Sequence, residues 1–339
     1  MCINVAVFPK SSQNPYVANF YSELDSKEVH ILDKVKWEFP LKADVLHIQW
    51  PEAWLWSQKK EIRKKNLKFI LLCASKHKSI GLKVVNTVHN LRPHKKQTFF
   101  ERVVYWYITR KCDGFIHLTE AGMESFFKKH RWAKRKKNTV IYHPSYEAQL
   151  CGITKSEARK KLSLEVDELR IVFFGRILPY KGVNNLIDAY LESVEGNGTS
   201  LWIGGPSDEE STQQIVSRVS GDDSIEFSPG FVDDAYLELQ VKAADWVVLP
   251  YSSGLNSGVA IYALSCGTRA IVPDSPVMRE MEQVTRFPSF KYFSKDNFRE
   301  VLDSVLSNGR MKDPTPDNSK LDPAVIGEQY HEFLNKLSE

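Results

Sequence analysis

The sequence predicts an α/β protein with two doubly wound parallel domains, and three observations support this fold class. Short apolar runs alternate with segments of helical spacing over residues 3–146, and the alternation starts again at residue 169. A polar stretch over 150–168 separates the two series. The length of 339 residues is typical of two domains. Ligands of such sheets bind at the carboxyl ends of the strands, so we expect two domains facing a central cleft.

The predicted elements follow in chain order. In the first half, apolar runs predict strands over 3–8, 43–50, 82–90, 114–119 and 138–146. Helical spacing predicts helices over 15–24, 57–79, 97–112 and 120–130. In the second half, strands are expected over 169–175, 200–205, 224–230, 245–251 and 269–273. Helices are expected over 182–194, 207–220, 233–243, 257–266 and 323–337.

The composition argues against several classes of protein. With 42% hydrophobic and 26% charged residues, the chain is an ordinary globular protein. We expect no transmembrane helix, because no long uncharged apolar run occurs, and no signal peptide at "MCINVAVFPK". The five cysteines are scattered and form no CxxC pair, which indicates free thiols in a reducing compartment rather than a zinc site.

Charge is divided unevenly along the chain. Residues 1–150 carry 27 Lys and Arg against 13 Asp and Glu, whereas the other residues carry 19 against 29. The first part therefore has a net charge of +14 and the second −10, within a total of +4. This asymmetry predicts an anionic partner for the first half, either nucleic acid or anionic lipid.

Two loops of the second half suit a diphosphate. Arg176 and Lys181 follow a buried strand and precede a helix, where cations and free backbone N–H groups bind anions. A second loop, "LPYSSGLNSGVAIYALSCG", places Asn256, Ser257 and Gly258 just before a helix. The ordinary alternatives are a solvated loop and a well-capped helix. No P-loop and no clear GxGxxG motif occurs.

Several motifs together resemble the GT-B glycosyltransferases of group 1 (family four). They are "FFGRILPYKGVNNLIDAY", "LWIGGP", "FSPGFVDDAYLELQVKAADWVVLPY" and "LNSGVAIYALSCGTRAIV", in the family's order over 169–275. The first half is similar more loosely, through "ADVLHIQWPE", "VNTVHNLRPH" and "VIYHPSY". The resemblance implies a GT-B fold with two Rossmann-like domains. The acceptor domain would span 1–150, the nucleotide-sugar domain 151–320, and a helix in 321–339 could cross back to the first domain.

The resemblance also implies roles for residues of the donor half. Arg176 and Lys181 would hold the diphosphate and stabilise the leaving group without a metal or other cofactor. The amides of Asn256, Ser257 and Gly258 would complete the phosphate site. Phe231 and Val232 fall where the family places the nucleobase.

One departure from the family pattern concerns the ribose. The family's Glu-x7-Glu pair is missing, and Gly254 and Tyr262 stand in its place. Tyr262 or a backbone group would have to replace the ribose contact. The departure leaves open whether the reaction retains or inverts the anomeric carbon.

In the first half, His89 and Glu52 are candidate catalytic residues. Both follow predicted strands, and His89 resembles the histidine that the family places near the reacting sugar. An inverting enzyme needs a general base for the acceptor hydroxyl, and either residue could serve. The ordinary alternative is a hydrogen-bonded histidine beside a strand.

Two basic segments, 57–79 and 126–137, mix cations with large apolar residues and favour contact with an anionic membrane. The alternative is helices packed on the sheet with solvated lysines. With the resemblance, this implies a cytoplasmic enzyme at the inner face of a bacterial membrane. It would move a hexose from a UDP- or GDP-sugar to a saccharide or lipid-linked acceptor of a cell-surface polysaccharide or glycolipid.

Other functions remain open at this point. The nearest alternative is an inverting GT-B transferase such as a β-mannosyltransferase. A non-enzymatic protein that binds nucleic acid or membrane through the basic half is another, although no nucleic-acid-binding motif occurs, so we expect no nucleic-acid partner. An inactive GT-B subunit would explain the missing glutamates but not the retained cations.

Overall fold

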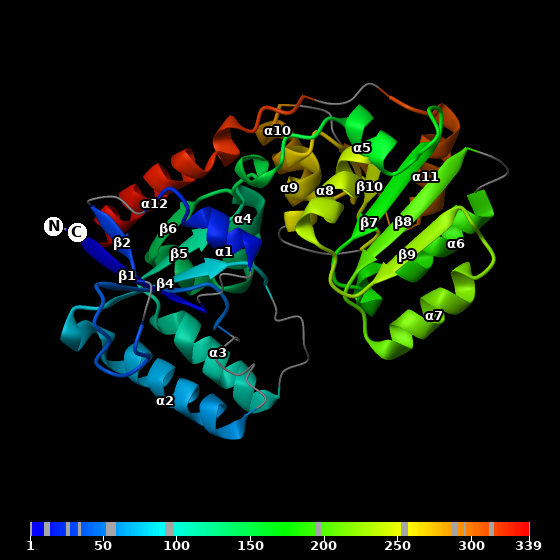
Figure 1. Ribbon diagram of the computed structural model, residues 1–339. Coiled ribbons are helices and arrows are strands. Elements are labelled where there is room, and N and C mark those ends of the chain that lie inside the picture. Colours follow the sequence, from blue (N-terminus) through cyan, green and yellow to red (C-terminus); the bar gives the residue numbers. More distant parts are fainter. Residues whose placement is uncertain are drawn as a thin grey trace. The chain divides into compact units, whose positions relative to one another are not determined.

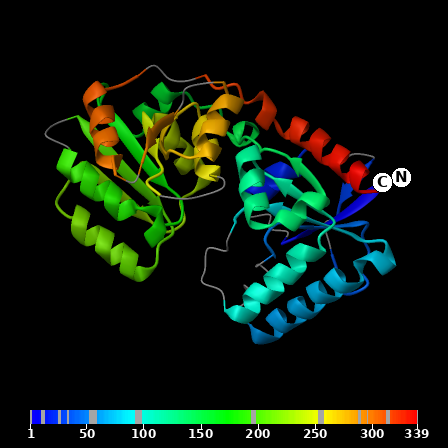
Figure 2. The same cartoon turned by 180° about the vertical axis from the view of Figure 1, so that it is seen from behind.

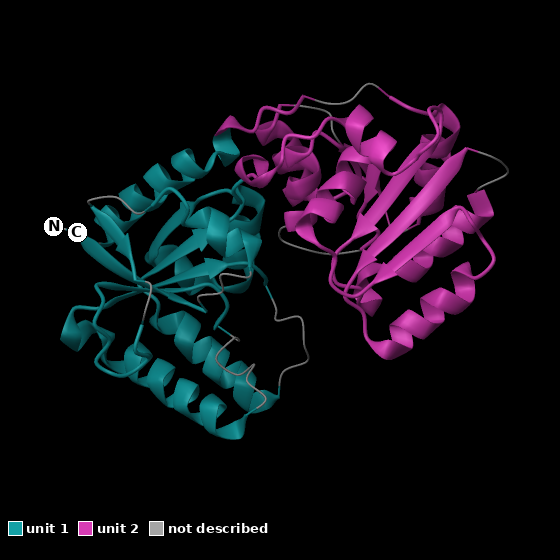
Figure 3. Ribbon diagram, in the orientation of Figure 1, with its two compact units in different colours: residues 1–144, 320–339 teal, residues 145–319 magenta. Residues whose placement is uncertain are grey.

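The computed structural model (Figure 1) describes residues 2–9, 14–24, 28–32, 35–51, 59–91, 98–193, 198–251, 257–286, 290–294, 296–311 and 315–338. The chain divides into two compact units (Figure 3). Unit 1 holds residues 1–144 and 320–339, and unit 2 holds residues 145–319. The C-terminal segment therefore belongs to the same unit as the N-terminal part of the chain.

Unit 1 is built on a six-stranded sheet whose neighbouring strands are all parallel. In spatial order the strands are β2 (Val29–Ile31), β1 (Ile3–Phe8), β3 (Val45–Ile48), β4 (Lys83–Val88), β5 (Gly114–His117) and β6 (Lys137–Val140). The chain moves from β1 to β2 on one side and then continues from β3 on the other. The switch point, where such sheets leave a crevice at their carboxyl edge, is thus between β1 and β3.

The helices of unit 1 cover this sheet. They are α1 (Pro15–Phe20), α2 (Lys60–Lys76), α3 (Phe99–Lys111), α4 (Glu120–Lys129) and α12 (Pro323–Ser338). Ile326, Tyr330 and Phe333 of α12 are spaced as one helical face, and all three are buried in the core of the unit. Figure 2 shows α12, in red, beside the sheet of unit 1 from behind. The last helix therefore completes the core formed by the first 144 residues.

Unit 2 repeats the architecture with another fully parallel six-stranded sheet. Its strands in spatial order are β12 (Phe290–Phe293), β11 (Arg269–Pro273), β10 (Trp246–Val248), β7 (Leu169–Phe174), β8 (Thr199–Gly205) and β9 (Ile225–Pro229). From β7 the chain moves through β8 to β9, and it then restarts at β10 on the opposite side of β7. The switch point of this sheet is between β7 and β10.

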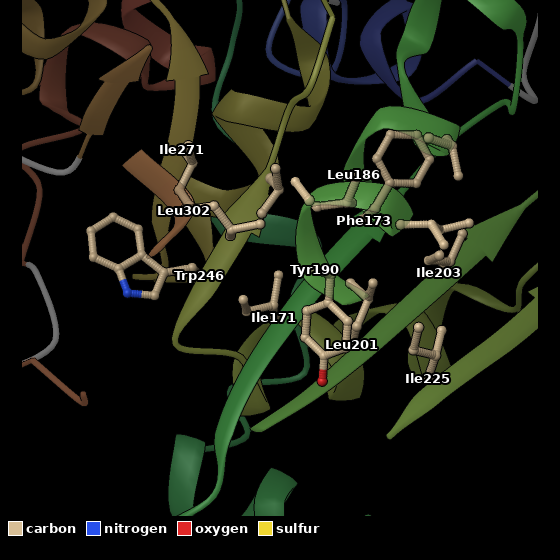
Figure 4. Packing of buried hydrophobic residues seen from close by; sticks show 14 of the residues in the cluster. Ile171, Phe173, Leu186, Tyr190, Leu201, Ile203, Ile225, Trp246, Ile271 and Leu302 are labelled. Atoms are coloured by element: carbon tan, nitrogen blue, oxygen red, sulfur yellow. The ribbon is translucent and has the colours of Figure 1, made fainter. Parts of the chain in front are cut away.

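Helices pack on the sheet of unit 2 through a continuous apolar core. They are α5 (Lys155–Lys161), α6 (Val183–Ser193), α7 (Glu209–Val219), α8 (Asp234–Ala243), α9 (Gly258–Ser265), α10 (Pro276–Val284) and α11 (Phe298–Asn308). Figure 4 shows Phe173 and Leu201 of the sheet with Leu186 and Tyr190 of α6. All four are buried, so the loop that connects β7 to α6 is anchored at both ends by close-packed elements.

The predicted α/β class with two doubly wound domains is confirmed, but five elements were not predicted. One is the short helix α5, which lies in the polar stretch 150–168. Strand β2 has only three residues, too few to show a period of two. Strand β12 and helices α10 and α11 were also missed, although α10 carries a readable helical spacing at Val277, Met281 and Val284. Helix α1 ends at Phe20 rather than at residue 24.

Candidate active site

The two anion-suited loops of unit 2 meet at its switch point. The first runs from Gly175 at the end of β7 to a single 3-10 turn, Pro179–Lys181, and the second follows β10. Gly182 has a φ of +71°, and a Cβ there would lie 2.2 Å from the carbonyl oxygen of Pro250. Only glycine combines this backbone conformation with so close an approach. The sequence had indicated two separate loops, and the structure joins them.

Lys181 is the cation at this junction. Its Nζ lies 4.0 Å from the centre of the Tyr251 ring, at the end of the second loop's strand. The Tyr251 hydroxyl forms a hydrogen bond with the Ser257 hydroxyl, and Ser257 Oγ accepts from the Ala260 amide at 3.3 Å as the N-cap of α9. A chain of contacts therefore links the ammonium to the N-terminus of α9.

Tyr251 could not be predicted as a site residue, because the sequence around an aromatic residue does not indicate which cation its ring contacts. Asn256, a predicted site residue, lies outside the described residues. Ser257 is buried, and Gly258 is the first residue of α9. Backbone N–H groups at this helix start are unpaired within the helix and suit an anion.

Burial sets the charge state of the Lys181 side chain. The side chain is half-buried, and desolvation lowers the pKa of its ammonium group to about 8. A bound anion would favour the charged form and raise that pKa again. Arg176, in the same loop, is exposed. The loop thus offers one sheltered cation and one solvated cation.

The other proposed donor residues lie at or near the same edge of the sheet. Phe231 and Val232 follow β9, and the Phe231 side chain is 85% exposed. Tyr262 is half-buried on α9, with its ring 5.5 Å from that of Phe174 and 5.4 Å from that of Tyr146. Burial raises the pKa of the Tyr262 phenol, so it stays a neutral hydrogen-bonding group.

In unit 1, His89 follows β4 and lines a small pocket at the carboxyl edge of the sheet. Its ring stacks on Trp50 with centroids 4.4 Å apart and meets Tyr16 edge-on at 4.8 Å. Its Nε2 lies 2.9 Å from Gln49 Oε1. The backbone amide of Gln49 in turn bonds to the Phe8 carbonyl at 2.7 Å, across the β1–β3 switch point. Glu52, the other proposed base, lies outside the described residues.

The hydrogen bonds around Gln49 determine which nitrogen of His89 carries the proton. Gln49 Nε2 donates to the Tyr21 hydroxyl at 2.5 Å, so its carbonyl oxygen faces His89. An amide oxygen only accepts, and the neutral His89 ring therefore holds its hydrogen on Nε2. The lone pair is then on Nδ1.

The same chain continues inward to His47. The Tyr21 hydroxyl lies 2.7 Å from His47 Nδ1 and, because it accepts from Gln49, can donate its own hydrogen there. His47 Nε2 can then donate to Thr87 Oγ1 at 2.8 Å. Tyr330 of α12 places its hydroxyl 2.9 Å from His47 Nδ1. The C-terminal helix thus supports the residues behind His89.

These histidines are kept neutral by their surroundings. Burial lowers the pKa of His89 well below its usual value, and the neighbouring His143 and His47 lower it further. Burial also lowers the pKa of His47 to about 3 and that of His143 to about 4. At neutral pH, His89 therefore presents an unprotonated nitrogen that can accept a hydrogen bond.

No helix in the described ranges is long and apolar enough to cross a membrane. Within those ranges, no group of three or more His, Cys, Asp or Glu side chains could hold a metal ion. All five cysteines are free thiols.

The fold of this chain is similar to that of solved glycosyltransferase structures. The two-sheet fold is that of GT-B glycosyltransferases. Anabaena Alr3699/HepE in complex with UDP matches with a TM-score of 0.68 at 13% identity, over 99% of this chain and 100% of the other. WaaG, a glycosyltransferase of lipopolysaccharide biosynthesis, matches with a TM-score of 0.63 at 14% identity, over 98% and 95%.

Sequence comparison agrees with the fold. Residues 154–320 match the family described as glycosyl transferases group 1. Over 335 residues the chain is 25% identical to the GDP-mannose:glycolipid 4-beta-D-mannosyltransferase of Xanthomonas campestris pv. campestris, which covers 98% of this chain and 91% of the relative. These similarities support a group 1 glycosyltransferase and confirm the predicted resemblance, and the chain is a glycosyltransferase enzyme.

Proposed function

We propose that this enzyme transfers a hexose from a nucleotide-sugar to a lipid-linked saccharide in the synthesis of a cell-surface polysaccharide or glycolipid. GDP-mannose is the first donor to test, because the Xanthomonas relative, similar over nearly its whole length, is named for GDP-mannose and a glycolipid. UDP-sugars are the second, because a solved structure of similar fold holds UDP. The observation that carries the proposal is the junction of Lys181, Tyr251 and the start of α9 at the switch point of unit 2.

Unit 2 would bind the donor. Lys181 and Arg176 would hold the diphosphate and stabilise the negative charge that develops on it as the sugar leaves. Backbone amides at Ser257 and Gly258, with Asn256, would complete the phosphate site. Phe231 and Val232 would contact the nucleobase, and Tyr262 would contact the ribose. We expect no metal ion to be required.

Unit 1 would activate the acceptor. We infer a single displacement in which the acceptor hydroxyl forms a bond to the anomeric carbon while the bond to the diphosphate breaks. His89 Nδ1 would take the hydroxyl proton, and the nucleoside diphosphate would leave with the bonding electrons. This route inverts the anomeric carbon, and the unprotonated Nδ1 supports it. Glu52 is the second candidate base. An NMR assignment of the product anomer tests the route, and retention would exclude it.

Donor binding is tested by thermal shift with GDP, UDP and their common sugar conjugates. A ligand that binds only the folded protein raises its stability by about 2.7 kcal/mol at a concentration of 100 times Kd. We expect a shift with one nucleotide family, its loss in Lys181→Ala, and its retention in Lys160→Ala, which changes an exposed lysine of the same unit. No shift with any nucleotide, or an equal shift in Lys181→Ala, would contradict the donor site.

Chelation tests the expectation that no metal takes part. Transfer in excess EDTA should equal transfer in buffer. Activity that is lost in EDTA and restored by Mg²⁺ or Mn²⁺ would mean that the diphosphate charge is neutralised by a cation other than Lys181 and Arg176.

The place of action proposed here is the cytoplasmic face of a membrane, with the enzyme bound peripherally through basic unit 1. The net charge of +14 over residues 1–150 supports attraction to anionic lipid. A lipid-linked acceptor would be reached at that surface.

A further inference from the structure

Helix α3 of unit 1 is apolar on both of its faces. Val104 and Ile108 are buried in the unit. On the opposite side, Phe99, Val103 and Trp106 are 81%, 46% and 51% exposed, and they recur at the i, i+4 and i+7 spacing of one helical stripe. A helix on the surface of a soluble protein normally turns polar residues to water. The outer face of α3 therefore suits a second apolar environment.

The stripe has further aromatic and cationic neighbours. Phe100 at its start is 59% exposed. Arg110 continues the stripe one turn beyond Trp106, and its guanidinium carbon lies 5.7 Å from the Trp106 ring and 5.2 Å from the Trp132 ring. An exposed apolar patch rimmed by charge marks an interaction site. Trp and Arg together are typical of a membrane interface.

Helix α2 runs beside α3, and both views of the unit show the two helices side by side (Figures 1 and 2). Its exposed cations include Lys60, Arg63, Lys64, Lys65 and Lys68. Among the residues that the structure describes, none of these five forms an ion pair. Their charge is therefore available to an external anionic partner.

The two basic segments keep only part of their apolar surface. Phe69 and Ile70 of segment 57–79 are buried, and so is Phe126 of segment 126–137, whereas Ile62 on α2 is 45% exposed. Among the described residues of unit 1, four exposed large apolar side chains lie on α3, which was predicted only as a helix. Exposed apolar side chains are therefore concentrated on α3, and exposed cations on α2.

We propose that the outer stripe of α3, residues Phe99, Val103 and Trp106, inserts into the interfacial layer of an anionic bilayer while the α2 cations bind the headgroups. Charge complementarity favours lipid, because cations near an anionic surface contribute about 1 kcal/mol each and no carboxylate on α2 except Glu61 opposes them. The proposal deepens the proposed function, since it names the surface through which the enzyme reaches a lipid-linked acceptor.

The experiment is flotation of the full chain with vesicles of phosphatidylcholine alone or with 30% phosphatidylglycerol. The variant Phe99→Ser/Val103→Ser/Trp106→Ser removes the stripe. The matched control, Val166→Ser/Val216→Ser/Met311→Ser, removes three exposed apolar side chains of unit 2. A charge variant, Lys64→Glu/Lys65→Glu/Lys68→Glu, reverses part of α2.

We expect wild type and control to bind anionic vesicles. The stripe variant should bind them with an affinity that is lower by a factor on the order of ten or more. The charge variant should lose the preference for anionic over zwitterionic vesicles. Equal binding of the stripe variant and wild type would overturn the proposal. So would wild-type binding that does not depend on phosphatidylglycerol, or a stripe variant whose only change is lost self-association in light scattering.

A second measurement does not depend on the stability of the triple variant. Brominated lipids should quench part of the tryptophan fluorescence of wild type, and this quenched part should be missing in Trp106→Phe. Equal quenching of wild type and Trp106→Phe would overturn the insertion of α3. The nucleotide thermal shift of unit 2 should be the same in every variant. Lost vesicle binding with an intact nucleotide shift therefore reports on the membrane surface, whereas a lost shift with intact vesicle binding reports on the donor site.

Discussion

Both sheets are parallel and each has a switch point at its carboxyl edge, but their strand orders differ, and so does the chemistry of the two edges. The edge of unit 1 is built from aromatic rings and histidines held neutral, such as His89 and His47. The edge of unit 2 is built from glycines, a helix N-terminus and the cation Lys181. All nine histidines of the chain lie in unit 1 and none in unit 2. One edge presents neutral hydrogen-bonding groups, and the other is suited to hold an anion.

The net charge of each part of the chain differs in sign from what the chemistry of its site suggests. Residues 1–150 carry +14, yet the described residues at the edge of unit 1 include the neutral histidines His89 and His47, whereas the net negative remainder of the chain holds the anion-suited loops. The positive charge of unit 1 is instead gathered on exposed helices such as α2. Net charge therefore describes what a unit attracts over a distance, and local geometry describes what its site binds.

The largest expected effect is a loss of stability of unit 1 in acid. The pKa is about 3 for His47 and about 4 for His117 and His143 in the folded protein, against about 6.5 when unfolded. Below pH 6.5 the unfolded chain binds protons that the folded unit does not. The stabilisation is therefore present above pH 6.5 and is lost as the pH falls toward 4, by up to about 4 kcal/mol per pH unit for three histidines.

Pulse proteolysis in urea at pH 7, 6 and 5, with fragments identified by mass spectrometry, measures this difference between the units. Cleavage should appear first in unit 1 as the pH is lowered. Unit 2 opening first, or both units losing stability equally, would be evidence against neutral buried histidines as the cause.

The next effect is on catalysis. Lys181→Ala should lower kcat on the order of 100- to 1000-fold, the cost of removing one group that stabilises a developing negative charge. The melting temperature without ligand should change little, because the side chain is only half-buried. Steady-state turnover of the best donor is the measurement, with Lys160→Ala as the control. Normal turnover in Lys181→Ala would remove this residue from the reaction.

Gly182→Ala tests whether the two loops of unit 2 must touch. The new methyl group would meet the Pro250 carbonyl oxygen, so we expect a loss of about 1–3 kcal/mol in unfolding free energy and weaker nucleotide binding. Gly152→Ala is a matched control, because its φ is +72° and no atom lies within 4 Å of the new Cβ. Urea denaturation of both variants separates the clash from the cost of the backbone conformation. Equal losses would show that the contact with Pro250 is unimportant.

A smaller effect concerns the pH dependence of donor binding. The Lys181 pKa of about 8 means that the free ammonium loses its proton near that pH, while a bound diphosphate would retain it. Binding then takes up a proton, and affinity should fall about tenfold from pH 7 to pH 9. Calorimetric titration with the nucleoside diphosphate measures this. Lys181→Arg should flatten the profile, and a flat wild-type profile would contradict the assigned charge.

The smallest effect is the position of one hydrogen. At pH 7, long-range ¹H–¹⁵N correlation spectra should show His89 with its proton on Nε2 and an unprotonated Nδ1. The spectrum of His89→Gln assigns the signals. A proton on Nδ1 would mean that Gln49 is oriented differently and that His89 cannot act as the proposed base through that atom.

Much of the fold could be predicted because its signals are local. The apolar runs at 3–8 and 169–175 are almost wholly buried strands, and Gly and Pro residues bound the loops after them. Strand β2 escaped prediction because three residues carry no period, and its place is set by its pairing with β1. Arg176 and Lys181 could be proposed from their place after a strand, but the contact of Lys181 with Tyr251 joins residues of two loops 70 positions apart.

The fold class, the family resemblance and the residue types suited to a diphosphate could be predicted from the amino-acid sequence, because periodicity and motifs depend on neighbouring residues. The burial of Lys181 against Tyr251, the tautomer of His89 beside Gln49, and the outward direction of Phe99, Val103 and Trp106 became visible in the folded structure alone. Each of these depends on burial and on the direction of side chains from distant segments. A pKa, a tautomer and the exposure of a side chain depend on the groups that surround it, and these groups come together when the chain folds.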